Sequence, residues 1–268
     1  MSFFCTVLVR RPPKLLFPIR VSFLHNDIEN TKIDGEPDLF ENEFWNNRIS
    51  TTPFQKNLLS LGSAVASLVD PHRHDMIACL GEVSGQKALS NIYDKMRNCS
   101  EGNAVLKDRP RINSKTVDLK ALKNLPANTF GQIYYKFLED NKVTPDSRLT
   151  VQFLDDVELG YVMQRYRECH DLYHAVLGMP THMLGEVTVK WIEALNNELP
   201  MCIGGALFGA LRLRPKQRMM YKNYYLPWAI KVGQAMPPLM CIYWEKRWDQ
   251  PIDDLRRELN IEMLKLPK

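Results

Sequence analysis

From residue 53 onward, apolar residues recur at helical spacings, and this period constrains the fold more than any other feature of the chain. Pro53 suits the first turn of a helix. Behind it, apolar side chains fall three or four residues apart and so share one helix face: Phe54, Leu58, Leu61, Val65 and Leu68. No segment alternates apolar and polar residues convincingly, as a half-buried strand does. We therefore expect an all-α protein with a single helical domain.

Turn and capping residues indicate where the other helices begin and end. A long helix is expected from about Asp156 to Leu177, because Gly178 suits a left-handed cap and Pro180 cannot continue the hydrogen-bond ladder. Thr181 is expected to cap the next helix, which runs to about residue 199. Residues 101–115 are polar and indicate irregular structure. Further helices are expected over 74–80, 84–96, 125–143, 201–211, 225–234, 238–247 and 252–261.

The N-terminal segment has the composition of a mitochondrial transit peptide. Residues 1–25 mix apolar side chains with Arg10, Arg11, Lys14 and Arg20 and contain no acidic residue. A secretory signal fits less well, because the arginines follow the first apolar run. We expect a transit peptide over 1–25, a linker or mobile arm over 26–50, and the helical domain over 51–268.

Net charge argues against a nucleic-acid partner. The chain has 35 basic and 31 acidic residues, and four of the basic ones lie in the transit-like segment. The remainder is therefore formally neutral, whereas binding to phosphates requires an excess of positive charge. The six cysteines lie far apart without a Cys-x-x-Cys pair, so neither a disulfide framework nor a thiolate zinc site is indicated.

The most apolar run, at residues 201–211, is too short to span a membrane. It has eleven residues, against the roughly 20 that a bilayer requires. Gly205 and Gly209 lie four apart, so a neighbouring helix or a lipid chain can approach that face. A basic strip follows, suited either to anionic lipid headgroups or to a solvated loop: Arg212, Arg214, Lys216 and Arg218.

The segment around residue 170 carries the ligand-type side chains. His170 and His174 are one helical turn apart, a spacing that brings two imidazoles within reach of one divalent ion. Asp171 lies between them, about 100° from His170 around the helix axis. Glu186 follows the break at 178–180, so it completes the site only if the next helix folds back. A metalloprotease would need Glu after the first histidine, and a solvated face or a self-satisfied buried network remains the alternative.

Three other histidines are rival candidates for metal ligands. His72 and His74 form a short metal-binding string, but they fall at an expected helix start. His182 lies four residues before Glu186, which suits a role next to the ion and not necessarily on it.

These residues match a known motif. The sequence His170-Asp171-x-x-His174, followed after eleven residues by Glu186, resembles the zinc motif of the coenzyme Q protein four family of mitochondrial ubiquinone biosynthesis. Similarity extends over roughly residues 50–262, through YVMQRYRECHDLYH, LPMCIGGALFGAL, LPWAIKVGQ and YWEKRWDQPIDDLRRELNI. The resemblance implies a helical fold with a groove for a prenyl tail. It also implies a Zn²⁺ ion on His170, Asp171, His174 and Glu186, with Asp171 either a ligand or an acceptor that orients an imidazole.

The resemblance further implies an activity and a location. The expected reaction is metal-dependent C1 decarboxylation of 4-hydroxy-3-methoxy-5-polyprenylbenzoate to 2-methoxy-6-polyprenylphenol. The expected location is the matrix side of the mitochondrial inner membrane, as a peripheral member of a multisubunit coenzyme Q synthesis complex, with a homo-oligomer left open. An oxidative variant would need a redox partner, and the sequence has no phosphate loop or dinucleotide fingerprint. The alternative is a non-catalytic scaffold with a structural zinc; a His-Asp phosphohydrolase ranks well below both.

Overall fold

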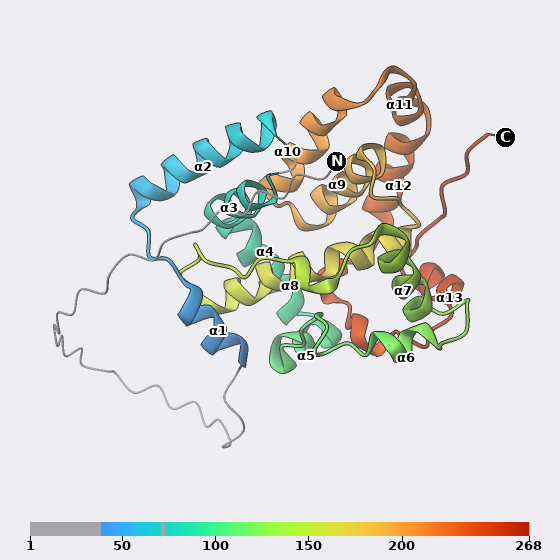
Figure 1. The fold of residues 1–268 in the computed structure, drawn as a ribbon, viewed down its shortest axis with the longest axis horizontal. Helices are drawn as coiled ribbons and strands as arrows, with labels where there is room; N and C mark the ends of the chain where they lie inside the picture. Colours follow the sequence, from blue (N-terminus) through green and yellow to red (C-terminus); the bar gives the residue numbers. More distant parts are fainter. Residues whose placement is uncertain (1–38, 71–72, 268) are drawn as a thin grey trace, which may run out of the picture. The chain divides into compact units, whose positions relative to one another are not determined.

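A computed structural model describes residues 39–70 and 73–267, and these residues form the helical domain that the sequence predicts (Figure 1). The transit-like segment and His72 lie outside this part. Within it no strand forms, apart from one isolated bridge between Thr129 and Pro251. The α-helices are α1 Leu39–Asn47, α2 Pro53–Val69, α3 His74–Ser84, α4 Gln86–Arg97, α5 Ser100–Asp108, α6 Leu119–Lys123, α7 Phe130–Asn141, α8 Val157–Leu177, α9 Met183–Asn197, α10 Pro200–Gly209, α11 Pro215–Met220, α12 Leu226–Ala235 and α13 Ile252–Glu258. Short 3-10 turns (η1 Pro145–Ser147, η2 Ala210–Arg212, η4 Leu239–Cys241, η5 Trp244–Lys246) and one π-turn (η3 Tyr221–Tyr225) complete the described elements.

Helix α8 lies at the centre of the domain. Asp156 caps its N-terminus by accepting hydrogen bonds from two backbone N–H groups, and Gly178 ends it with φ 64° in the left-handed region. Every residue from 160 to 177 is buried. A helix buried all round must pair its charged side chains, and Arg165 does so with Glu245 at 2.5 Å, as Arg167 does with Glu82 at 2.5 Å.

The predicted arm over 26–50 is wrong for residues 39–47, which form helix α1. Phe40 and Phe44 are buried, and Phe44 packs against α8 at Gly160. A Cβ atom at Gly160 would lie 2.4 Å from the Phe44 ring, so glycine is needed for this contact. Two aromatic residues one helical turn apart thus pack α1 against the core, and Glu43 adds an ion pair with Arg111 at 2.7 Å.

Two other local predictions are also corrected. Residues 100–108 are not irregular but form α5, because Val105 and Leu106 are buried in the core. The expected helix at 238–247 is replaced by two 3-10 turns. The backbone N–H groups of Leu239 and Tyr243 donate to the side chains of Asn196 and Glu101, which take the place of helical carbonyl acceptors.

Helix α10 packs against α9 through its glycines. A Cβ atom at Gly205 would lie 3.2 Å from the Lys190 side chain, and one at Gly209 would lie 2.7 Å from Val187. The glycine spacing therefore serves close helix packing, the first of the two alternatives left open by the sequence. In the described ranges, no helix has both the length and the apolar character needed to cross a membrane.

Candidate metal centre

The two histidines of the motif point from the last turns of α8 toward the start of α9. His170 and His174 are buried, and their ring centroids lie 4.8 Å apart. The turn that follows α8 fixes His174, whose Nδ1 lies 3.1 Å from the backbone oxygen of Met179. Both imidazoles are thereby held on one face of the helix, as the spacing of four residues predicts.

Helix α9 folds back across this face because its first turn fits tightly against the preceding loop. A Cβ atom at Gly185 would lie 1.9 Å from the backbone oxygen of Pro180, so only glycine permits this approach. His182, and not Thr181 as expected, caps α9: its Nδ1 accepts from the Gly185 N–H at 3.2 Å. Glu186 then falls in the first turn, with its carboxylate directed at the two histidines.

Three ligand atoms converge. Glu186 Oε2 lies 3.5 Å from His170 Nε2, and Glu186 Oε1 lies 3.4 Å from His174 Nε2. The ligand atoms of the three residues all lie within 4.8 Å of one another. Two ligands of one tetrahedral zinc ion, each about 2.0–2.2 Å from it, stand about 3.3–3.6 Å apart. The nitrogen-to-oxygen distances therefore match a shared ion.

The hydrogen bonds on the other side of each ring support the same conclusion. In a neutral imidazole one nitrogen donates and the other accepts. Nδ1 of His170 faces the Glu193 carboxylate at 2.7 Å, and Nδ1 of His174 faces a backbone carbonyl, so each neutral ring carries its proton there. Both Nε2 atoms then present lone pairs toward Glu186. His174 Nε2 is buried and makes no hydrogen bond to any described residue, which leaves an acceptor that a cation would satisfy.

Glu193, which contacts His170 Nδ1, is not singled out by the sequence pattern. It is fully buried, and its Oε2 accepts from Lys190 Nζ at 2.6 Å and from the Tyr166 hydroxyl at 2.8 Å. A carboxylate that accepts from the second nitrogen of a metal-binding histidine fixes the ring and raises its basicity. One signal was available: Glu193 lies seven residues after Glu186, on nearly the same face of α9.

Burial and charge act in opposite directions on these groups. Burial alone would raise the pKa of Glu186, but its interactions with the adjacent His170 and His174 rings outweigh burial and hold that pKa well below its ordinary value. For His170, burial and the Lys190 charge lower the pKa, yet Glu193 and Glu186 leave it raised. The site thus favours positive charge between two carboxylates.

Asp171 is not part of this group. It is buried, and its Oδ1 accepts a hydrogen bond from Nη2 of Arg148, with which it forms an ion pair. The pKa of Arg148 is raised because its interactions with Asp171 and Glu186 outweigh burial. Its Nε is buried without a hydrogen-bond partner in the described part of the chain. A ligand role for Asp171 stays a prediction; in this structure the converging group consists of His170, His174 and Glu186.

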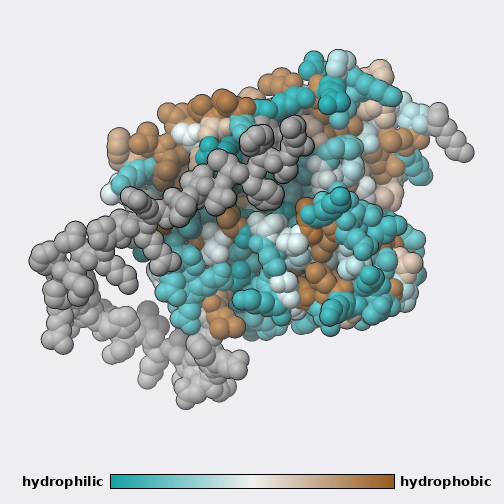
Figure 2. All heavy atoms as spheres, viewed as in Figure 1, coloured by the Kyte–Doolittle hydropathy of each residue, from teal (hydrophilic) through white to brown (hydrophobic). Residues whose placement is uncertain are grey.

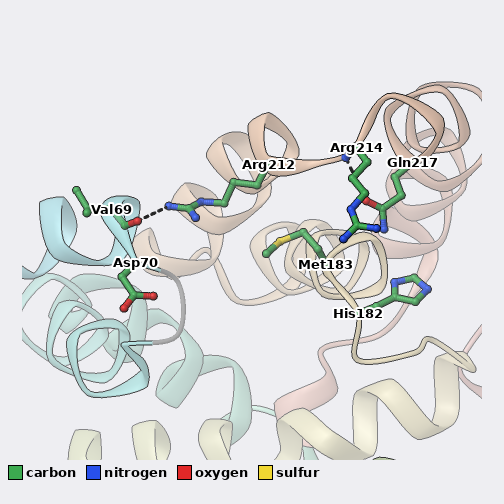
Figure 3. Close-up of a pocket in the computed structure, with 7 residues that line it drawn as sticks. All are labelled: Val69, Asp70, His182, Met183, Arg212, Arg214 and Gln217. Carbon is green, nitrogen blue, oxygen red and sulfur yellow. Dashed lines mark hydrogen bonds between the residues drawn. The ribbon is translucent and has the colours of Figure 1, made fainter. Parts of the chain in front are cut away.

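The rival histidines do not join the site. His74 begins α3 and is exposed. Among the described residues, only His170, His174 and Glu186 bring three ligand atoms of this kind together. His182 serves as the cap of α9 and lines a pocket of about 600 Å³ (Figure 3). The other residues that line it are Val69, Asp70, Met183, Arg212, Arg214 and Gln217. The pocket begins one helical turn before Glu186 along α9, and its two arginines make it basic.

Comparisons with known proteins identify the family. The family model described as "Coenzyme Q (ubiquinone) biosynthesis protein Coq4" matches residues 45–265. Relatives described as "Ubiquinone biosynthesis protein COQ4 homolog, mitochondrial" include one from Aedes aegypti, 62% identical over 229 residues, which are 85% of this chain and 84% of that protein. One from Drosophila virilis is 63% identical over 229 residues, 85% of this chain and 86% of that protein.

A solved structure supports the fold. The crystal structure of a protein from Nostoc punctiforme, described provisionally as a ubiquinone biosynthesis protein, superposes with a TM-score of 0.62 at 20% identity. The match covers 77% of this chain and 98% of that one. The family match spans most of the chain, and the close relatives cover more than four fifths of it. The chain therefore belongs to the Coq4 family of coenzyme Q (ubiquinone) biosynthesis proteins.

Proposed function

We propose that this protein removes the C1 carboxylate of 4-hydroxy-3-methoxy-5-polyprenylbenzoate in a zinc-dependent reaction that yields 2-methoxy-6-polyprenylphenol. The observation that carries the proposal is the number of converging ligands. His170, His174 and Glu186 supply three ligand atoms, while Asp171 is engaged by Arg148. Structural zinc sites are closed by four protein ligands, whereas catalytic sites use three and keep one position open. Three ligands favour the catalytic role over the scaffold.

The substrate's own para hydroxyl group makes the reaction possible. As a phenolate it pushes electron density to C1, where a proton is added. The bond from C1 to the carboxylate then breaks, its electron pair returns to the ring, and CO2 leaves; the net change is one proton consumed and one CO2 released. Zinc in the site supplies Lewis-acid stabilisation of negative charge on substrate oxygens.

The surrounding side chains have separate tasks in this proposal. Glu193 holds His170 by its Nδ1, and the 178–180 turn holds His174. Arg148 provides positive charge and a free Nε–H beside the site, suited to the substrate carboxylate. Nδ1 of His182 accepts the hydrogen bond that caps α9, so in the neutral ring the proton is on Nε2. We assign this Nε2–H as the group that donates the proton to C1 of the substrate.

The proposal also includes the substrate's tail and the protein's surroundings. The pocket at the start of α9 is the opening that we assign to the polyprenylated substrate. We place the protein peripherally on the matrix side of the mitochondrial inner membrane, in a complex with other coenzyme Q biosynthesis proteins. The mitochondrial description of its relatives supports the organelle. A homo-oligomer stays a prediction.

The test is carboxyl release by the isolated protein. Purified, zinc-loaded chain is incubated with a short-chain prenylated 4-hydroxy-3-methoxybenzoate labelled in its carboxyl carbon, under air and under nitrogen, and labelled CO2 is counted. We expect release in both atmospheres. Release only under air would require an oxidative reaction instead. No release in either atmosphere, with zinc confirmed bound, would contradict catalysis and favour the scaffold.

A further inference from the structure

Helix α2 exposes the face that its sequence pattern would place in a core. Its five regularly spaced apolar residues lie within an arc of about 80° around the helix axis. Their exposed fractions are Phe54 76%, Leu58 61%, Leu61 67%, Val65 53% and Leu68 50%. The helix packs on α3 from its other side, where Ser63 is buried. An amphipathic helix normally buries its apolar stripe, so this stripe has no partner among the described residues.

The apolar surface continues from α2 onto α10. Helix α10 exposes Ile203, Leu207 and Phe208, and Leu211 follows at 72% exposure. Arg212 connects the two helices, because its Nη2 donates to the backbone oxygens of Leu68 and Val69. Figure 2 shows apolar residues gathered along the edge of the domain that α2 forms in Figure 1. We call the exposed apolar residues of α2, α10 and position 211 the apolar ridge.

The segments that carry the apolar ridge contain basic but no acidic residues. Residues 199–244 contain no Asp or Glu, and neither do residues 51–69. The first stretch carries six basic residues: Arg212, Arg214, Lys216, Arg218, Lys222 and Lys231. Lys56 is the one basic residue of the second stretch, and it pairs with Asp155, as Lys231 pairs with Glu262. The positive border therefore consists of Arg212, Arg214, Lys216, Arg218 and Lys222. In a chain whose body has balanced charge, an apolar surface bordered by these cations is complementary to apolar chains bordered by anions.

We propose that the apolar ridge and its basic border rest on the surface of an anionic lipid bilayer. Leucine and phenylalanine side chains would enter the acyl boundary, and the arginines and lysines would meet phosphate groups, as in interfacial amphipathic helices. A second copy of this chain fits poorly, because a two-fold contact through the same surface brings basic borders together. The inference gives a surface to the membrane association in the proposed function and does not depend on the reaction.

This orientation also explains where the pocket opens. Val69 and Arg212 belong both to the pocket lining and to the junction between α2 and the segment after α10 (Figure 3). A prenylated molecule held in the bilayer would therefore meet the pocket at the edge of the apolar ridge, one helical turn from the metal centre along α9. Arg214 and Gln217 lie on the far side of the same opening.

The experiment measures vesicle binding by the full-length chain. Arg10, Arg11, Lys14 and Arg20 are changed to serine in every form, so that the transit-like segment adds no charge. Binding is measured by cosedimentation with phosphatidylcholine vesicles, with and without cardiolipin. The ridge variant carries Leu58→Asp and Leu61→Asp, and the border variant carries Arg214→Gln and Lys216→Gln. Leu39→Asp is the matched control, because Leu39 is 79% exposed but lies outside the ridge.

We expect the parent to bind vesicles that contain cardiolipin. The affinity of the ridge variant for these vesicles should be at least about tenfold lower, since two exposed leucines no longer enter the lipid. The border variant should lose about fivefold per charge on cardiolipin vesicles, and added salt should weaken binding further. The control should bind like its parent. Equal binding by the ridge variant and its parent would overturn the proposal. A parent that binds no vesicles but forms a dimer in light scattering, with the dimer lost in the ridge variant, would overturn it as well.

Failure of this inference is distinguishable from failure of the proposed function. Decarboxylation of a short-chain substrate in detergent does not require a membrane, so the ridge variant should release CO2 at the parent's rate. Vesicle binding without any turnover would leave the surface assignment intact and contradict the reaction. Turnover without vesicle binding would do the opposite.

Discussion

Replacing Glu193 by glutamine should weaken zinc binding while leaving the three ligands in place. The carboxylate lies 2.7 Å from His170 Nδ1, and glutamine keeps its shape but not its charge. Loss of such a partner typically lowers metal affinity 10–100-fold, or about 1.4–2.7 kcal/mol. The same change leaves the Lys190 ammonium facing a neutral amide. Breaking a buried charge pair costs up to about 3–5 kcal/mol, so the free energy of unfolding should also fall.

Two measurements separate these effects. Zinc affinity is measured by competition with a chelating dye, and thermal unfolding is measured with saturating zinc. Tyr166→Phe is the matched control: it removes the hydroxyl that donates to Glu193 Oε2 at 2.8 Å but leaves the contact with His170. We expect Glu193→Gln to bind zinc at least about tenfold more weakly than Tyr166→Phe. Equal zinc affinities for Glu193→Gln, Tyr166→Phe and the parent would refute the idea that Glu193 positions His170.

Three further predictions concern the ligands, the fold-back of α9 and acid stability. His174→Ala should abolish stoichiometric zinc, because it removes a nitrogen donor; one zinc per chain in metal analysis of this variant would disprove the assignment. Gly185→Ala should destabilise the protein by about 1–3 kcal/mol or more and weaken zinc binding, since the added Cβ collides with Pro180; a melting temperature and zinc affinity equal to the parent's would contradict this close contact. Hydrogen bonds from Lys56 and a neighbouring arginine lower the pKa of Asp155, so its contribution is present above the unfolded value of about 3.9 and is lost as pH falls. Because Asp155 is half exposed, Asp155→Asn should cost less than about 1 kcal/mol at neutral pH. Urea unfolding should show this difference shrinking as the pH falls below the unfolded value of about 3.9; a difference that does not shrink there would refute the pairing.

The sequence predicts the centre of the fold well because local chemistry decides it. Asp156 and Gly178 mark the ends of α8, and both serve as the caps that their residue types favour. The pairing of His170 with His174 follows from helical geometry alone. Glu186 reaches the two histidines only if α9 folds back on α8, and the helix break at 178–180 indicates such a turn.

What the sequence does not predict depends on contacts between distant segments. Glu193 meets His170 only when α9 crosses α8, and Asp171 pairs with Arg148, 23 residues earlier in the chain. Helix α1 packs on the core because the Phe44 ring fits against Gly160. The polar composition of residues 39–47 does not reveal this contact. The stripe of α2 has the period of a core helix, and only the structure places it on the surface.

The most direct test of the catalytic metal centre is Glu186→Gln, assayed with saturating zinc. Glutamine keeps an oxygen donor and the side-chain shape but removes the negative charge that the two histidines stabilise. Zinc content, melting temperature and labelled CO2 release are measured on the same preparation. We predict a variant that stays folded and loaded with zinc, with turnover reduced far more than stability. A variant that regains full product formation once zinc is supplied would contradict catalysis at this centre, because zinc would then only brace α8 against α9.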